Sequence, residues 1–207
     1  MWDFLKQLTD PNSIIQFGGL GLLLFVIFAE TGLLVGFFLP GDNLILLAGI
    51  LCKSKPELLG VNYIVMVTLM VLAAVSGNLF GYWFGYKSGV MLFKREDGFL
   101  FKKKHLETTE LAYNKYGGNL VLIIARFLPV VRTFAPILAG AIKLDFKKFM
   151  LFNILGAVFW IVGLTAIGYV SVILFPSITN YLSYVFIALI ILTALPIIRL
   201  RFIKKNN

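Results

Sequence analysis

Residues 22–51, LLLFVIFAETGLLVGFFLPGDNLILLAGIL, form an apolar stretch that carries two acids, Glu30 and Asp42. A second apolar stretch, 119–142, reads NLVLIIARFLPVVRTFAPILAGAI and carries two bases, Arg126 and Arg132. One charge at the centre of a membrane helix costs about 2.5–3.5 kcal/mol, so four unpaired charges would cost on the order of 10 kcal/mol. We therefore expect these side chains to pair or to be solvated by a cavity. The pattern predicts a shared polar site at mid-membrane.

The composition surrounding these stretches is that of an integral membrane protein. The chain has 207 residues, of which 59% are hydrophobic and 14% charged, and its mean hydropathy is +0.91. A soluble domain would have about 25% charged residues. This length indicates one membrane domain over 1–207. Cys52 and His105 are the only cysteine and histidine, so we expect no disulfide, no metal site and no cofactor.

The net charge of +9 does not indicate a nucleic-acid partner, because of where the basic residues lie. They gather between 93 and 118, between 143 and 148, and between 199 and 205. In a membrane protein this distribution fixes orientation, with the basic segments cytoplasmic. Attraction to anionic lipid headgroups is a secondary expectation.

Three segments have the length and apolarity of full membrane crossings, for which about 20 residues are needed. They are 62–86, 149–173 and 179–198. In the first, Gly77, Gly81 and Gly85 recur every four residues and share one helical face. A stripe of small residues lets a second helix approach closely, so we expect it to be a packing face.

The two charged stretches are interrupted and are predicted to be re-entrant hairpins. Residues 14–51 are too long for one crossing, and 119–142 are barely long enough. Because proline and glycine break helices, the predicted hairpin breaks are Gly32, Pro40, Gly41, Pro129 and Pro136. Irregular backbone at membrane depth must be buried in protein or reached by water. The alternative for the first stretch is a full crossing by 14–36, which would put the N-terminus in the cytoplasm.

The hairpins resemble each other and predict an internal repeat. Each has Phe-Leu-Pro followed by Leu-Ala-Gly and then by a spanning helix with Asn-x-x-Gly, at Asn78 and at Asn153. With the basic segments cytoplasmic, the first hairpin opens outward and the second inward. The expected fold is an all-α inverted repeat of two re-entrant hairpins plus about three spanning helices, a plan common in secondary transporters. Repeat one covers about 1–90, a basic loop 93–118, repeat two about 119–175 and a final helix 179–198.

The four charges are the candidate site residues. A carboxyl group in apolar surroundings favours its neutral form, so Glu30 and Asp42 are candidates for taking up and releasing protons. The alternatives are that Asp42 caps a helix and that Glu30 forms a fixed salt bridge to an arginine. Arg126 and Arg132 offer the fork of donors that suits a phosphate, or else they only clamp the acids. No constellation typical of a soluble enzyme is present, so we expect no enzymatic activity.

Three motifs resemble the DedA family of the VTT-domain (SNARE-associated Golgi) superfamily, over about residues 10–200. They are FAETGLLVGFFLPGDNLILLAG at 28–49, GNLFGYWFGYKSG at 77–89 and RFLPVVRTFAPILAG at 126–140. The resemblance places the family's acidic pair on Glu30 and Asp42 and its essential arginines on Arg126 and Arg132. The family often has an acid where this chain has Asn78, which leaves Asn78 as a candidate cavity-lining residue.

The resemblance implies lipid translocation between leaflets of a bacterial inner membrane, with undecaprenyl phosphate or a phospholipid as substrate and a link to proton motive force. Membrane lipids and protons are then the expected partners, and a homo-oligomer stays open. Two alternatives remain. One is a proton-coupled antiporter for small cations or drugs, and the other is a membrane assembly factor that transports nothing.

Overall fold

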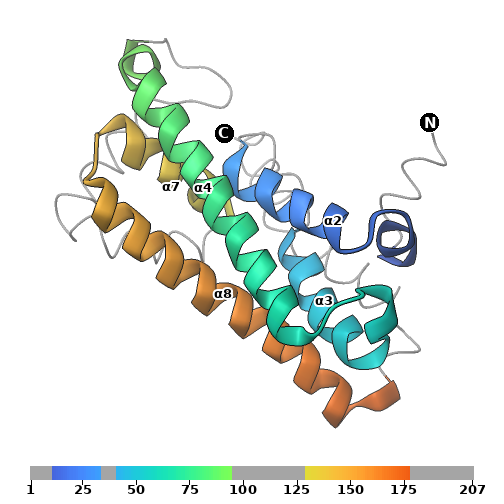
Figure 1. Cartoon of the computed structure of the whole chain (residues 1–207). Helices are drawn as coiled ribbons and strands as arrows, with labels where there is room; N and C mark the ends of the chain where they lie inside the picture. Colours follow the sequence, from blue (N-terminus) through green and yellow to red (C-terminus); the bar gives the residue numbers. More distant parts are fainter. Residues whose placement is uncertain (1–10, 34–40, 95–128, 178–207) are drawn as a thin grey trace, which may run out of the picture. The chain divides into compact units, whose positions relative to one another are not determined.

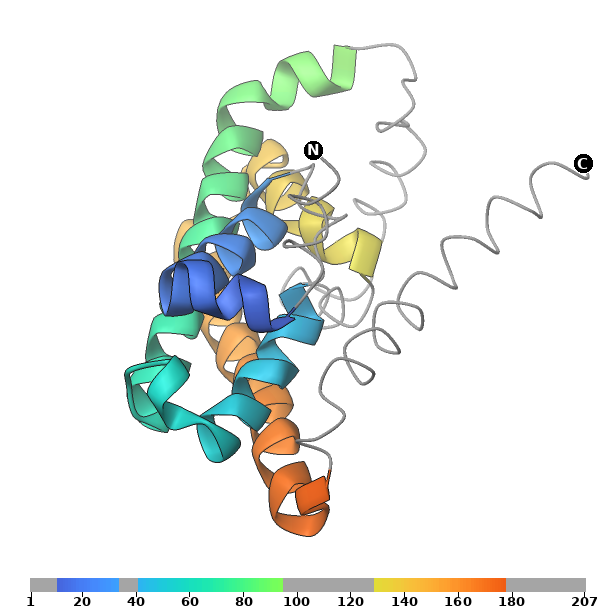
Figure 2. The same cartoon turned by 90° about the vertical axis from the view of Figure 1, so that its right-hand side faces the viewer.

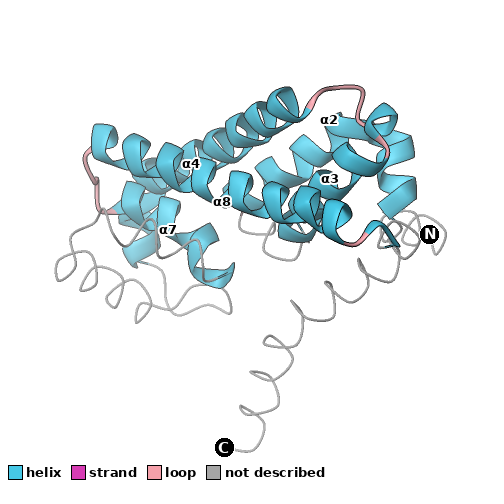
Figure 3. Ribbon diagram, turned by 90° about the horizontal axis from the view of Figure 1, so that it is seen from below, coloured by secondary structure: helices cyan, strands magenta, loops and turns pink. Residues whose placement is uncertain are grey.

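The computed structural model describes residues 11–33, 41–94 and 129–177, which form helices and no strands (Figures 1 and 3). The helices are α2 (Pro11–Gly32), α3 (Gly41–Ser54), the short 3-10 helix η2 (Pro56–Leu58), α4 (Tyr63–Lys94), α7 (Pro129–Ala141) and α8 (Phe146–Leu174). The predicted all-α class is confirmed for this part of the chain.

Helices α4 and α8 match two of the predicted crossings. Their segments Tyr63–Ser88 and Phe146–Leu174 are long and apolar enough to span a membrane. Each helix starts at a side-chain cap, which satisfies a backbone donor that has no partner within the helix. Asn62 Oδ1 accepts a hydrogen bond from the Val65 N–H, and Asp145 Oδ1 accepts one from the Lys148 N–H, both at 2.9 Å. The third predicted crossing, 179–198, lies outside the described residues.

No other described helix is both long and apolar enough to cross a membrane alone. Helix α3 has 14 residues and α7 has 13, against the roughly 20 that a crossing needs. Helix α2 is interrupted at Gly19, whose φ of 49° is left-handed, and its apolar part is Gly19–Gly32. Whether 14–36 forms a hairpin or a full crossing stays a prediction, because residues 34–40 lie outside the described part of the chain. The hairpin tips lie outside the described residues, so the re-entrant path and its inversion stay predictions.

Four of the five predicted breaks can be compared with helix ends, and one is wrong. Helix α2 ends at Gly32, α3 begins at Gly41 and α7 begins at Pro129, where proline's fixed φ suits a first helical position. Pro136, by contrast, lies inside α7. Pro136 faces α4, where a Cβ placed on Gly81 would lie at an ordinary contact distance of 3.5 Å from Pro136 Cβ. Pro40 lies outside the described residues.

The chain divides into two compact units, and each is described by itself. Unit 1 contains the described parts of 1–23, 40–66 and 163–207. Its α3 lies directly on the end of α8, because any Cβ on Gly49 or Gly168 would overlap a backbone carbonyl of the opposite helix, that of Thr165 or of Leu46. The Tyr63 and Thr165 hydroxyls share a hydrogen bond of 3.0 Å there.

Unit 2 contains the described parts of 24–39 and 67–162. Here α7 lies on the later part of α4 (Figure 2) in the same manner as α3 lies on α8. A Cβ on Gly140 would overlap the Tyr82 carbonyl oxygen, and one on Gly85 would overlap that of Ile137. The predicted packing role of the α4 glycine stripe is thus confirmed. The two Leu-Ala-Gly motifs also have the same structural role, which supports the internal repeat.

Helix α7 ends in a Schellman motif that places a lysine where glycine is usual. The Leu144 N–H donates to the Ala139 carbonyl at 2.9 Å and the Lys143 N–H donates to the Gly140 carbonyl at 3.0 Å. This pattern puts a left-handed residue at the position of Lys143, whose φ is 53°. A side chain in that conformation costs roughly 1–2 kcal/mol.

Candidate functional site

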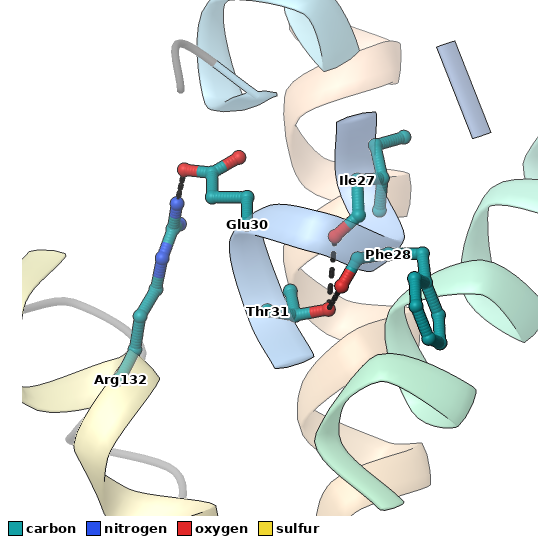
Figure 4. A network of polar contacts seen from close by, with 5 residues as sticks. All are labelled: Ile27, Phe28, Glu30, Thr31 and Arg132. Carbon is teal, nitrogen blue, oxygen red and sulfur yellow. Dashed lines mark hydrogen bonds and ion pairs between the residues drawn. The ribbon is translucent and has the colours of Figure 1, made fainter. Parts of the chain in front are cut away.

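Glu30 lies in the last turn of α2, and local hydrogen bonds hold that turn in place. The Thr31 hydroxyl oxygen lies 2.9 Å from the Ile27 carbonyl and 3.2 Å from the Phe28 carbonyl, to which it donates (Figure 4). The Leu33 N–H donates to the Ala29 carbonyl at 2.9 Å and closes the helix. The break that follows Gly32 therefore leaves Glu30 on an ordered helix end.

Arg132 reaches Glu30 from the first turn of α7 (Figure 4). Its Nη2 forms an ion pair with Glu30 Oε1, and the two side chains are only 9% and 7% exposed. The Arg132 Nε–H is buried with no hydrogen-bond acceptor in the described part of the chain. Because single buried charges are costly, we expect acids of the first apolar stretch to pair with bases of the second. Glu30 and Arg132 form such an ion pair.

The glycine stripe of α4 supports both helices that carry the ion pair. The end of α2 meets the stripe at Gly77, since a Cβ built on Gly32 would lie 2.6 Å from the Gly77 carbonyl oxygen. Helix α7 meets it at Gly85 and passes Gly81 with Pro136 and Ile137. One face of α4 thereby fixes the distance between the helix that carries the carboxylate and the helix that carries the guanidinium.

Of the other two candidate charges, the structure describes Asp42. Asp42 is in unit 1, where it is partly buried in the first turn of α3. An acid there is stabilised by the partial positive charge of the helix N-terminus. Because α3 begins at Gly41, Asp42 lies inside the first turn, and both its capping role and its proton binding stay predictions. Arg126 lies outside the described residues. The structure therefore brings together Glu30 and Arg132 of the four.

Asn78, predicted as a cavity-lining residue, is packed between helices. Its Nδ2 donates to Asn153 Oδ1 of α8 at 2.8 Å, and Asn153 Nδ2 donates to the Val75 carbonyl at 3.1 Å. The two side chains are 8% and 3% exposed. The asparagines of the two Asn-x-x-Gly motifs thus form a hydrogen bond with each other. The repeated motif marks both residues in the sequence, but it does not predict that they meet.

We expect Asn78→Leu to destabilise the protein by about 1–3 kcal/mol, because it leaves the Asn153 amide buried without its partner. Asn78→Leu combined with Asn153→Leu should cost less than the sum of the single changes, since neither amide is then left facing an apolar side chain. Thermal unfolding in detergent measures both. Strictly additive losses would show that the hydrogen bond contributes nothing.

Tyr82 is buried, although tyrosine near the end of a spanning helix often lies in an interfacial belt. It is 7% exposed, its ring stacks on Phe149 with centroids 4.4 Å apart, and its hydroxyl donates to the Leu144 carbonyl at 2.6 Å. Trp83 and Tyr86, its neighbours on α4, are half exposed as a belt requires.

No group of three or more potential metal ligands gathers among the described residues.

Comparison with known proteins gives one consistent result. Residues 39–170 match the family model described as the VTT domain. The chain is 36% identical to "Protein DedA" of Escherichia coli over 175 residues, which cover 84% of this chain and 78% of that one. It is 35% identical over 173 residues to an uncharacterized membrane protein of Mycobacterium tuberculosis, covering 80% and 74% of the two chains.

A further relative is the "Inner membrane protein YghB" of Escherichia coli, 33% identical over 168 residues that cover 78% of this chain and 71% of the other. No solved structure matches the chain significantly. Together with the two apolar helices that are long enough to cross a bilayer, these relatives place the chain among bacterial membrane proteins.

Proposed function

The chain belongs to the DedA family of VTT-domain membrane proteins, and we propose that it moves a phosphate-bearing lipid between the leaflets of a bacterial inner membrane. Undecaprenyl phosphate and phospholipids are the substrate classes. The proposal rests above all on the buried ion pair between Glu30 and Arg132. It assigns the chain transport and no enzymatic reaction, with membrane lipids and protons as partners.

The ion pair supports lipid-phosphate transport because one guanidinium can serve two anions in turn. Arginine stays charged and offers five N–H donors in a planar fork, which fits a phosphate as well as a carboxylate. In the resting state the anion is Glu30. A lipid phosphate that enters the site replaces the carboxylate as the partner of Arg132, so the cation never lacks a counterion at membrane depth.

Protons enter this scheme through Glu30. When the carboxylate takes up a proton it loses its charge and no longer competes for Arg132, which favours binding of the phosphate. When it releases the proton, the carboxylate reclaims Arg132 and the phosphate is displaced. This exchange links lipid movement to the proton gradient. We propose that Asp42 and Arg126 supply a second acid and a second base.

The same observation also favours a second candidate, an assembly factor in which the pair is a permanent clamp. A charge exchange separates the two candidates. Glu30→Arg combined with Arg132→Glu keeps a pair of opposite charges, so a clamp regains full activity. For a transporter the swapped pair presents the cation from α2 instead of α7, and we expect a folded protein with little transport.

The direct test is flipping of fluorescent polyprenyl phosphate, phosphatidylethanolamine or phosphatidylcholine in proteoliposomes, with and without a pH gradient. We expect the wild type to accelerate flipping of a phosphate lipid and Arg132→Gln to lower that rate at least about tenfold. A loss of this size corresponds to one charge-assisted contact of about 1.5 kcal/mol or more. Lys53→Gln, a change at an exposed lysine, is the matched control.

Three results would overturn the assignment. A wild-type rate for Arg132→Gln would remove the arginine from the transport step. Full recovery in the charge-exchanged double variant would favour the clamp. Proton flux driven by a small cation, without movement of any labelled lipid, would favour an antiporter.

A further inference from the structure

A cluster of lysines and exposed aromatic rings gathers where the later part of α4 meets the α7–α8 turn, all within unit 2. We name it the rim and define it as Lys87, Lys143, Lys147 and Lys148 with the rings of Trp83 and Tyr86. All four lysines are exposed, and the two rings are 51% and 52% exposed. The glutamate–arginine pair described above uses none of these residues.

Lysine side chains of the rim rest on its rings. Lys87 Nζ lies 4.1 Å from the centroid of the Trp83 ring, and Lys143 Nζ lies 5.8 Å from that of Tyr86. At these distances an ammonium group is attracted to the face of an aromatic ring. Tryptophan and tyrosine rings at the end of a spanning helix lie at the level of the lipid headgroups. A cation held over such a ring lies at the same depth.

Within the described part of the chain, the rim carries more positive than negative charge. Among the described residues none of the four lysines forms a salt bridge. The one carboxylate within the α7–α8 turn, Asp145, accepts the Lys148 backbone N–H and caps α8. Counted over the described residues, four lysines and one acid give the rim a net charge of about +3 beside exposed aromatic surface, which suits a partner that is anionic at one end and apolar at the other.

The backbone beneath the rim is fixed. Tyr82 anchors the turn to α4 by donating to the Leu144 carbonyl, and its ring contacts Phe146 and Phe149 with centroids 5.7 and 4.4 Å away. Lys143 takes the left-handed conformation at a position where glycine would be free of strain. A strained residue held by its surroundings is a common mark of a functional position. Here the left-handed residue is the lysine whose ammonium lies 5.8 Å from the centroid of the Tyr86 ring.

We propose that the rim is a binding site for the headgroup of an anionic phospholipid of the adjoining leaflet, bound at the protein's edge and not transported. The lysines would contact the phosphate, and the two rings would lie against the glycerol and upper acyl chain. Lysine near a membrane surface contributes roughly fivefold in affinity for anionic lipid. Several lysines on a fixed turn give selectivity for anionic over zwitterionic lipid.

Trp83 provides the readout. The chain has three tryptophans, so replacing Trp2 and Trp160 by phenylalanine leaves Trp83 as the only reporter. This protein is reconstituted into phosphatidylcholine vesicles in which one tenth of the lipid is brominated phosphatidylglycerol, or brominated phosphatidylcholine as the reference. We expect brominated phosphatidylglycerol to quench Trp83 fluorescence at least about threefold more strongly, and 0.5 M salt to reduce that difference.

Lys143→Gly distinguishes a lipid site from a purely structural turn. Glycine relieves the left-handed strain, so the melting temperature in detergent should rise by roughly 2–4 °C, while the preference for phosphatidylglycerol should fall about fivefold. Lys143→Arg should keep the preference. Replacing all four rim lysines by glutamine should abolish it, whereas Lys53→Gln, whose ammonium lies 5.4 Å from the Tyr169 ring in unit 1, should leave it unchanged.

The proposal is overturned if wild-type Trp83 is quenched equally by the two brominated lipids. It is also overturned if the quadruple glutamine variant keeps the wild-type preference, or if Lys53→Gln removes as much of it as Lys143→Gly. Should 10 mM inorganic phosphate in detergent protect the protein against unfolding as well as phosphatidylglycerol does, the site binds free phosphate and the lipid assignment fails. None of these outcomes depends on flipping activity.

Discussion

Glu30→Gln is expected to lower the melting temperature of the detergent-solubilised protein by on the order of 10 °C at every pH from 5 to 8. The variant leaves the Arg132 guanidinium buried without its carboxylate. Removing one partner of a buried ion pair typically costs 3–5 kcal/mol, and each kcal/mol corresponds to about 2–4 °C in a protein of this size. Arginine cannot escape this penalty by losing its proton, so the loss should not depend on pH.

Arg132→Gln should behave differently, because a buried carboxyl group can become neutral. With its cation gone, Glu30 keeps its proton in the folded protein at pH values where it is ionised in the unfolded chain. The folded state then binds more protons, so its stability falls as pH rises, by up to about 1.4 kcal/mol per pH unit. Arg132→Gln should therefore lower the melting temperature less than Glu30→Gln does at pH 5, and by nearly the same amount at pH 8.

Melting curves followed by fluorescence-detected size exclusion at pH 5, 6.5 and 8 measure this difference. Lys53→Gln serves as the control for loss of an exposed charge, and it should shift the curve by less than about 2 °C. If Arg132→Gln lost the same stability at all three values, or if Glu30→Gln were the milder variant at pH 5, the carboxylate would not be the main counterion of Arg132.

Helix positions and the existence of buried charge pairing could be predicted from sequence because they follow from local physics. Helices α4 and α8 follow from length and apolarity, and the ends at Gly32, Gly41 and Pro129 follow from residues that break or start helices. The glycine stripe of α4 indicated a packing face because its period is that of a helix. Because a single buried charge is costly, Glu30 is expected to have a partner of opposite charge. The sequence does not indicate which of the two arginines that partner is.

The features that could not be predicted depend on which helices meet. Arg132 as the partner of Glu30, the contact between Asn78 and Asn153, and the burial of Tyr82 all join segments far apart in sequence. Periodicity identifies a face of a helix but not the helix that covers it. The sequence predicts a break at Pro136 because proline usually ends a helix, whereas α7 starts at Pro129 and continues past Pro136 to Ala141.

Gly140→Ala is expected to separate α7 from α4 and to lower stability by about 3 kcal/mol or more. A Cβ on Gly140 would overlap the Tyr82 carbonyl oxygen and lie 2.7 Å from the Tyr86 backbone nitrogen. Overpacking a core with one methyl group costs about 1–3 kcal/mol when side chains can adjust. Here the obstacles are backbone atoms of a helix, so the whole of α7 must move away.

Gly163→Ala is the matched control, because it adds the same methyl group in α8 at an exposed position with nothing within 4 Å. Alanine favours helix over glycine by up to about 1 kcal/mol, so the control should stabilise the protein slightly. Melting temperature and the yield of monodisperse protein measure both variants. Gly85→Ala should lower stability as Gly140→Ala does, because its Cβ would overlap the Ile137 carbonyl.

Since α7 carries Arg132, its displacement should also disrupt the ion pair with Glu30, so Gly140→Ala should lose lipid flipping even where it folds. A Gly140→Ala protein that melts within 2 °C of the wild type would contradict the direct backbone contact on which the position of Arg132 depends.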